Sequence, residues 1–157
     1  MGQRALYDPI SLWLESRGFR AMITGHKKNF VIPISDLFAG PYKIPDLVGI
    51  DGNNRVVIAE AETRKERFFD ALGRCMLWRN MATFAYLAYP KGEISRAAFL
   101  SRIGVGLLEV DIASHAVTEL IALPNEGDKL RFGVLEIYPT DIPREQQLAA
   151  LIRGSIG

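Results

Sequence analysis

The clearest pattern of apolar and polar positions lies between residues 44 and 64, which read IPDLVGIDGNNRVVIAEAETR. Two apolar runs rich in β-branched residues flank the polar sequence DGNN, a combination typical of a β-hairpin. If Ile50 faces Val56 across the turn, antiparallel counting brings Asp46 opposite Glu60. The pattern therefore predicts two antiparallel strands with an acidic side chain at the same end of each.

Side chains alternate between the two faces of a strand, so Glu62 is expected on the same face as Glu60. Opposed like charges destabilise a sheet, and a bound divalent cation is the simplest reason for three carboxylates on one patch. Oxygen ligands suit Mg²⁺, Mn²⁺ or Ca²⁺ better than Zn²⁺. A register slip of one residue would move Asp46 to the other face. The alternatives are a structural calcium site and acids that are simply solvated at the strand ends.

Helical periodicity precedes and follows this hairpin. Asp8 and Pro9 are predicted to cap and begin a first helix, which Gly18 ends. Thr63 is predicted to cap a second helix that runs to about Asn80. The apolar face expected for this second helix comprises Phe68, Phe69, Leu72 and Met76, and its opposite face comprises Arg67, Trp78 and the ion pair of Asp70 with Arg74.

Further extended segments are predicted at 19–23 and 30–34, before the hairpin, and at 83–89 and 104–111, after the second helix. A strand, a helix and another strand in succession favour a crossover connection between parallel neighbours. The remaining predicted elements are a short helix at 94–103, strands at 117–123 and 131–138, and a terminal helix at 143–153. The expected fold class is therefore α/β, with a central mixed β-sheet flanked by helices.

Composition limits the functional classes without selecting one. The chain has 157 residues, of which 48% are hydrophobic and 24% charged, and this fits one globular domain. The formal net charge is +1, so a nucleic-acid site has to be a local patch. Cys75 is the single cysteine; it excludes an internal disulfide and is expected in the core. No apolar run has transmembrane length and no secretory leader is evident, so we expect a cytoplasmic protein without a membrane partner.

The segments PDLVGID and VVIAEAE together resemble the signature of the PD-(D/E)xK nucleases, the family with the restriction-endonuclease-like fold. Pro45 and Asp46 match the PD element, and Glu60 matches the acid of the second element. Glu62 stands where the signature has Lys, and this ExE form is a known variant among restriction enzymes of the fold.

The likeness extends from the first helix to the strand that ends near Asp111. It implies a restriction-endonuclease-like core over about residues 5–111, within a single nuclease-like domain of residues 1–157. Residues 112–157 would add further strands and the C-terminal helix. Homodimers are common for this fold.

The resemblance implies a metal-dependent endonuclease that hydrolyses phosphodiester bonds, with DNA as the expected nucleic acid. Asp46 and Glu60 would hold Mg²⁺, or Mn²⁺ in its place. Glu62 would be the third catalytic residue, accepting a proton from the attacking water. Positively charged side chains near the hairpin are candidates for binding the phosphates of the substrate. These are Lys43, Arg64, Lys65, Arg67 and Arg74.

The acid at Glu62 leaves a second interpretation open. In that interpretation the chain keeps the nuclease fold but has lost catalysis, and it binds nucleic acid or a protein partner without cutting. Both interpretations require the same sheet, and they differ in whether the carboxylates act on a bound ion.

Overall fold

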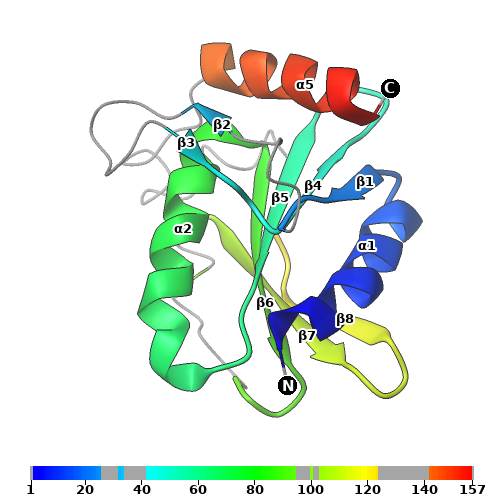
Figure 1. Cartoon of the computed structure of the whole chain (residues 1–157), viewed down its shortest axis with the longest axis vertical. Coiled ribbons are helices and arrows are strands. Elements are labelled where there is room, and N and C mark those ends of the chain that lie inside the picture. Colours follow the sequence, from blue (N-terminus) through cyan, green and yellow to red (C-terminus); the bar gives the residue numbers. More distant parts are fainter. Residues whose placement is uncertain are drawn as a thin grey trace.

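The computed structural model describes residues 2–25, 32–33, 42–94, 100, 103–123 and 142–156. Within them a six-stranded sheet runs in the order β1-β4-β5-β6-β7-β8 (Figure 1). Its strands are β1 (Arg20–Ile23), β4 (Leu47–Ile50), β5 (Val56–Ala61), β6 (Phe84–Pro90), β7 (Val105–Asp111) and β8 (Ala116–Ile121). A separate pair consists of β2 (Ile32–Pro33) and β3 (Tyr42–Lys43). The helical elements are η1 (Gln3–Leu6), α1 (Tyr7–Ser16), η2 (Lys65–Arg67), α2 (Phe68–Met81) and α5 (Ile142–Ile156).

The sheet is mixed, as its sequence predicts. β4 and β5 form an antiparallel hairpin in which Ile50 pairs with Val56, so the predicted register is confirmed. β5, β6 and β7 are parallel neighbours, and α2 forms the crossover between the first two of them. The outer strands β1 and β8 pair antiparallel with β4 and β7. The prediction of an α/β fold with a mixed sheet flanked by helices is therefore confirmed.

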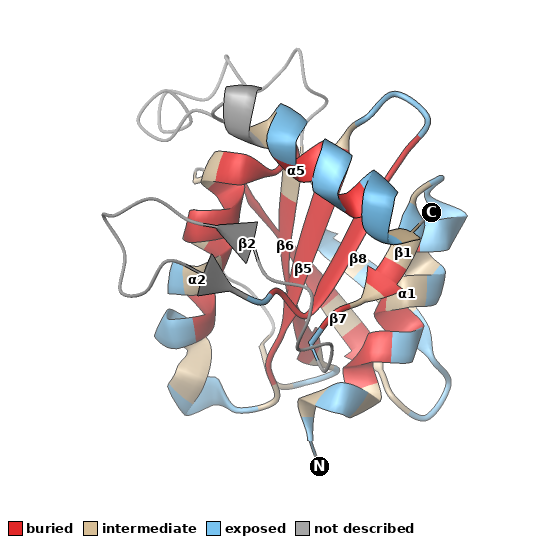
Figure 2. Ribbon diagram, turned by 45° about the horizontal axis from the view of Figure 1, so that its top comes forward, coloured by how far each residue is buried: buried red, intermediate tan, exposed pale blue. Residues whose placement is uncertain are grey.

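The helices cover the sheet on both faces. Along β5, Val57 and Ala59 pack on the α1 side, whereas Val56 and Ile58 pack on the side of α2 and α5. This alternation follows from the two-residue period of a strand. All six residues of β5 are buried, and Figure 2 shows the strand enclosed between the helical layers. Cys75 of α2 is also fully buried, as predicted.

Helices α1 and α2 begin differently from the sequence prediction. α1 begins at Tyr7 and follows η1 directly, and Leu6 at its N-cap makes no side-chain capping bond. α2 begins at Phe68 after η2, so Thr63 is not its cap. In each case a turn of 3₁₀-helix leads into the α-helix, and its carbonyls accept the first helical N–H groups: Arg4 for Tyr7 and Lys65 for Phe68. A capping side chain is therefore not needed for those groups.

The faces of α2 also differ from the prediction. Phe69, assigned to the apolar face, is 78% exposed, and Trp78, assigned to the opposite face, is only 1% exposed. The predicted ion pair between Asp70 and Arg74 is replaced by other pairings: Asp70 lies 3.8 Å from Arg67, and Arg74 binds Glu60 of the sheet. The reason is that α2 buries a second stripe, which carries Arg74 and Trp78, against an acidic residue of β5.

Several predicted elements lie wholly or mostly outside the described residues. These are the strand at 131–138, most of the helix at 94–103, and most of the extended segment at 30–34. Within the part of the chain that the structure describes, no helix has both the length and the apolar character needed to cross a membrane.

Two leucines on α1 provide a test of the core. Leu14 is completely buried, whereas Leu12 is 62% exposed on the same helix. Replacing Leu14 with Ala should lower the free energy of unfolding by about 2–5 kcal/mol, because it removes buried apolar surface and leaves a cavity. Leu12→Ala should change it by less than about 0.5 kcal/mol. Urea denaturation measures both, and equal losses would contradict this packing of α1.

Candidate functional site

Asp46 lies directly before β4, and its environment fixes both its backbone and its side chain. Its carbonyl accepts hydrogen bonds from the N–H groups of Thr24 and Gly25, at 2.8 and 2.9 Å. Its carboxylate Oδ1 accepts one from the Tyr7 hydroxyl, and Oδ2 accepts one from the Ala61 N–H, each at 2.8 Å. The side chain is therefore held between α1 and the end of β5.

Glu60 is the fifth residue of β5 and is almost completely buried. Its Oε1 accepts a hydrogen bond from the Trp78 indole N–H, and its Oε2 accepts one from the Arg74 Nε–H at 3.2 Å. Arg74 and Trp78 are four residues apart on α2, so they occupy the same helix face. The Glu60 carboxyl also lies close enough to that of Asp46 to share a hydrogen bond with it. The predicted approach of the two acids is thus present in the structure.

The proximity of the two carboxyl groups has an electrostatic consequence. Burial, followed by the negative charge of Asp46 and the hydrogen bond with it, raises the pKa of Glu60 well above its ordinary value. Trp78 and Arg74 oppose this effect because they stabilise the charged form. The Glu60 carboxyl therefore retains a proton at pH values where an exposed glutamate has lost it.

Glu62 follows β5 and is buried on the same side of the sheet, but it does not join this pair. Its Oε1 lies 3.3 Å from the Arg67 Nε, and its Oε2 accepts a hydrogen bond from the Thr63 N–H at 2.8 Å. Among the described residues, no group of three or more His, Cys, Asp or Glu side chains is arranged to hold a metal ion. The structure therefore brings together two of the three predicted carboxylates and gives the third a separate partner.

The predicted phosphate-binding residues fall into different environments. Arg67 and Arg74 bind acidic side chains of the site, as described above. Arg64 and Lys65 are exposed on the segment that leads into α2, and Arg64 lies 3.9 Å from Glu66. The side chain of Lys43 lies outside the described residues.

Two donors of the site, Tyr7 and Trp78, are not among the site residues predicted from the sequence. Tyr7 is 39 positions from Asp46, and no local pattern links them. Trp78 could have been found, because it lies one turn beyond Arg74 on the helix that follows the motif.

A close backbone approach completes the pocket of Asp46. A Cβ atom at Gly25 would lie 2.5 Å from the Tyr7 hydroxyl oxygen and 3.0 Å from Asp46 Oδ1. A larger residue at this position would therefore displace the tyrosine from the carboxylate.

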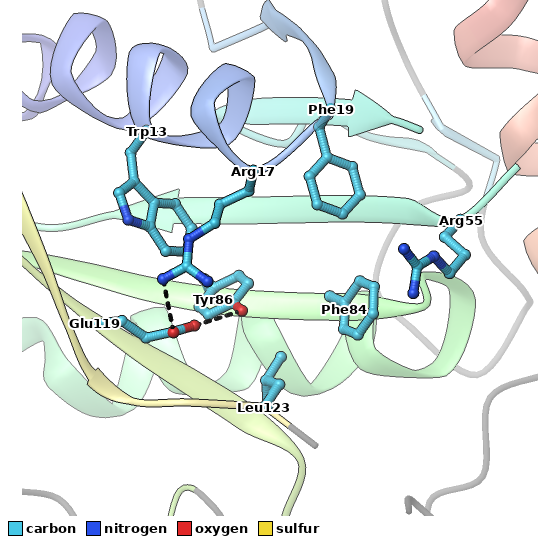
Figure 3. A pocket seen from close by; sticks show the side chains of 8 residues that line it. All are labelled: Trp13, Arg17, Phe19, Arg55, Phe84, Tyr86, Glu119 and Leu123. Carbon is cyan, nitrogen blue, oxygen red and sulfur yellow. Dashed lines mark hydrogen bonds and ion pairs between the residues drawn. The ribbon is translucent and has the colours of Figure 1, made fainter. Parts of the chain in front are cut away.

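A second feature is a hollow of about 170 Å³ on the α1 side of the sheet, opposite to the face that carries Glu60 (Figure 3). Three of its polar side chains bind one another: Glu119 accepts hydrogen bonds from Arg17 and from the Tyr86 hydroxyl, at 3.1 and 2.8 Å. Small-molecule sites commonly occupy about 300–1,000 Å³, so this hollow is small for one. The residues that line it are Trp13, Arg17, Phe19, Arg55, Phe84, Tyr86, Glu119 and Leu123.

No protein-family model matches the chain, and no curated protein matches it. Among solved structures, the chain is similar to the SPO1766 protein of unknown function from Silicibacter pomeroyi, with a TM-score of 0.54 and 14% sequence identity. The similarity covers 99% of this chain and 94% of that chain. At this level of identity the likeness shows the fold alone.

The protonation of Glu60 leads to a testable pH dependence. Because its pKa is raised in the folded state, its contribution to stability is fully present below the unfolded pKa of roughly 4.3 and is lost as the pH rises toward the folded pKa. Glu60→Gln should remove this contribution, so above the unfolded pKa the free energy of unfolding of the variant should fall less steeply with rising pH than that of the wild type. Urea denaturation in the presence of EDTA measures the slope.

Glu66→Gln is the matched control, because the Glu66 side chain is 71% exposed and should leave the slope unchanged. Identical slopes for the wild type and Glu60→Gln would show that Glu60 binds no extra proton on folding.

Proposed function

We propose that this protein is a magnesium-dependent nuclease of the PD-(D/E)xK type, with a restriction-endonuclease-like core, that hydrolyses phosphodiester bonds in DNA. Asp46 and Glu60 are the proposed metal ligands. The observation that carries the proposal is the meeting of these two carboxyl groups at the end of the β4–β5 hairpin, in the order and register of the motif. Two buried acids in contact are unfavourable unless a proton, hydrogen-bond donors or a cation compensate them, and a divalent ion would be such a cation.

The donor set fits Mg²⁺ or Mn²⁺. Mg²⁺ is commonly bound through one or two carboxylates, and waters and substrate phosphates complete its octahedron. A third protein carboxylate is therefore not required. Each ionised carboxylate offers about four acceptor positions, and two on Asp46 are used by Tyr7 and Ala61. Acceptor positions therefore remain for an ion beside the protein donors.

When bound, Mg²⁺ would relieve negative charge on the phosphate and lower the pKa of a water molecule. The chain itself would position the ligands: Tyr7 and Ala61 orient Asp46, and Trp78 orients Glu60. Arg74 binds Glu60 in the absence of metal, and it would be free to contact a phosphate if a metal ion took its place on Glu60.

Glu62 is the proposed acceptor of the proton from the attacking water. A carboxylate in this position acts as a base and cannot supply the positive charge of the usual lysine. Arg67 holds the Glu62 carboxylate in place. The exposed Arg64 and Lys65 would contact neighbouring phosphates of the DNA backbone.

One observation favours a second candidate function, binding of nucleic acid without cleavage. All four oxygens of the Asp46 and Glu60 carboxyls have protein donors without an ion, from Tyr7, Ala61, Trp78 and Arg74. A protein that has lost catalysis would also be stable with its carboxyl oxygens hydrogen-bonded in this way, because no metal ion is needed to pair them. Binding without metal-dependent cleavage would identify this case.

A cleavage assay with variants of the pair tests the nuclease function. Asp46→Asn and Glu60→Gln should each reduce Mg²⁺-dependent cleavage by on the order of 100-fold or more, because each removes a charged metal ligand while keeping a similar shape. The measurement uses single-stranded, duplex and branched DNA, with Mg²⁺, with Mn²⁺ and with EDTA. Circular dichroism verifies that the variants fold.

Glu15→Gln is the control for loss of an acidic side chain. Glu15 is exposed about two turns along α1 from Tyr7, and the amide can still accept the hydrogen bond from the Ala21 N–H. Its activity should equal that of the wild type. Full cleavage by both Asp46→Asn and Glu60→Gln would refute the assignment of the metal ligands.

A further inference from the structure

The hydroxyl of Tyr89 has an unusual environment. Tyr89 is the sixth residue of β6 and is 1% exposed, and its buried hydroxyl oxygen has no hydrogen-bond partner among the residues that the structure describes. Buried polar groups nearly always have a partner, so an unpaired one requires an explanation. By contrast, the buried hydroxyls of Tyr7 and Tyr86 donate to Asp46 and Glu119.

The strand register places Tyr89 on the face of the sheet that carries Glu60, beside Glu62 at the end of the neighbouring strand. Ala61 pairs with Ala88, and the N–H of Glu62 donates to the Ala88 carbonyl at 3.0 Å. Glu62 and Tyr89 are the next residues along these two neighbouring chain segments, so they lie side by side. Leu87 pairs with Glu60 and packs in the same cluster as Tyr89, which puts the tyrosine on the face of the sheet that carries the acids. The Tyr89 ring is held there by Phe68 of α2, with a distance of 6.3 Å between ring centroids.

The charges of the site act on this hydroxyl. Burial and the negative charge of Glu62 raise the pKa of Tyr89, and the positive charge of Arg74 opposes the effect. The hydroxyl thus stays protonated at neutral pH and can act as a hydrogen-bond donor. A donor in this position lacks an acceptor until a ligand supplies one.

We propose that the Tyr89 hydroxyl donates a hydrogen bond to a non-bridging oxygen of the phosphodiester bound at the Asp46–Glu60 pair. This inference rests on the proposed nuclease function and adds a residue to it. Glu62 in place of the motif lysine offers an acceptor instead of a side-chain donor, and Tyr89 on the neighbouring strand would supply a donor. A phosphate oxygen is the acceptor that the substrate brings to this place.

The experiment compares Tyr89→Phe with Tyr86→Phe. Both remove one hydroxyl from a buried ring of β6, but the Tyr86 hydroxyl is already bonded to Glu119 on the opposite face. Tyr89→Phe should lower kcat for cleavage by about 10- to 100-fold with a smaller change in KM. It should also leave the urea midpoint unchanged or raise it, because an unpaired buried hydroxyl is removed. Tyr86→Phe should show the reverse: a lower midpoint and unchanged cleavage.

A binding measurement separates this inference from the nuclease function itself. A fluorescently labelled oligonucleotide is titrated with each protein, with Ca²⁺ in place of Mg²⁺ to suppress cleavage. Tyr89→Phe should bind it about 3- to 10-fold more weakly than the wild type, which corresponds to the loss of one hydrogen bond. If the wild type binds but does not cut, this weaker binding still supports a phosphate contact by Tyr89.

Three results would overturn the inference. Equal cleavage and equal binding by Tyr89→Phe and the wild type would remove Tyr89 from the site and leave the nuclease function standing. If Tyr89→Phe loses activity and its urea midpoint also falls, the hydroxyl stabilises the fold, for example by binding a buried water molecule, and does not contact the substrate. If the wild type neither binds nor cuts, the nuclease function and the role of Tyr89 fail together.

Discussion

The buried contact between the carboxyl groups of Asp46 and Glu60 is the constraint on which the rest of the site depends. Two acids at this separation repel each other unless protons, donors or cations compensate them. The protein supplies donors from both helical layers: Tyr7 from α1, and Trp78 and Arg74 from α2. The contact therefore ties together the two faces of the sheet at one end of the β4–β5 hairpin.

Arg74 links the metal-free site to the proposed reaction. Its guanidinium is half-buried on Glu60, where it supplies the positive charge that a metal ion would otherwise provide. Under the proposed function, an ion and this arginine would compete for the same carboxylate, so the affinity for metal would be set partly by the free energy of releasing the arginine. Substrate can offset this cost, because a phosphate offers the guanidinium a second anionic partner. If the proposed function holds, metal and DNA would bind with positive cooperativity.

The hairpin could be predicted because a short polar turn and the two-residue alternation fix its register, and with it the approach of Asp46 to Glu60. The position of the Glu62 side chain could not be predicted. Alternation along a strand gives the face on which a side chain lies but not its distance from Asp46 and Glu60, and beyond the end of β5 the Glu62 side chain binds Arg67. The helix starts were missed because 3₁₀ turns replaced the capping side chains. Trp78 was predicted on the exposed face of α2 because polar residues on one face of a helix usually indicate exposure to solvent. In the structure this face of α2 packs over the buried Glu60. The contact with Tyr7 joins segments far apart in the sequence, for which a single chain carries no signal.

The close approach of Gly25 to Tyr7 and Asp46 restricts how this sequence can diverge. Because a methyl group at position 25 would collide with the phenol, the glycine and the large ring form a matched pair. Related chains that gain bulk at position 25 would need a shorter side chain at position 7, and the aspartate would then lose its hydroxyl donor. Covariation between these two positions would therefore mark which relatives retain this way of holding the first acid.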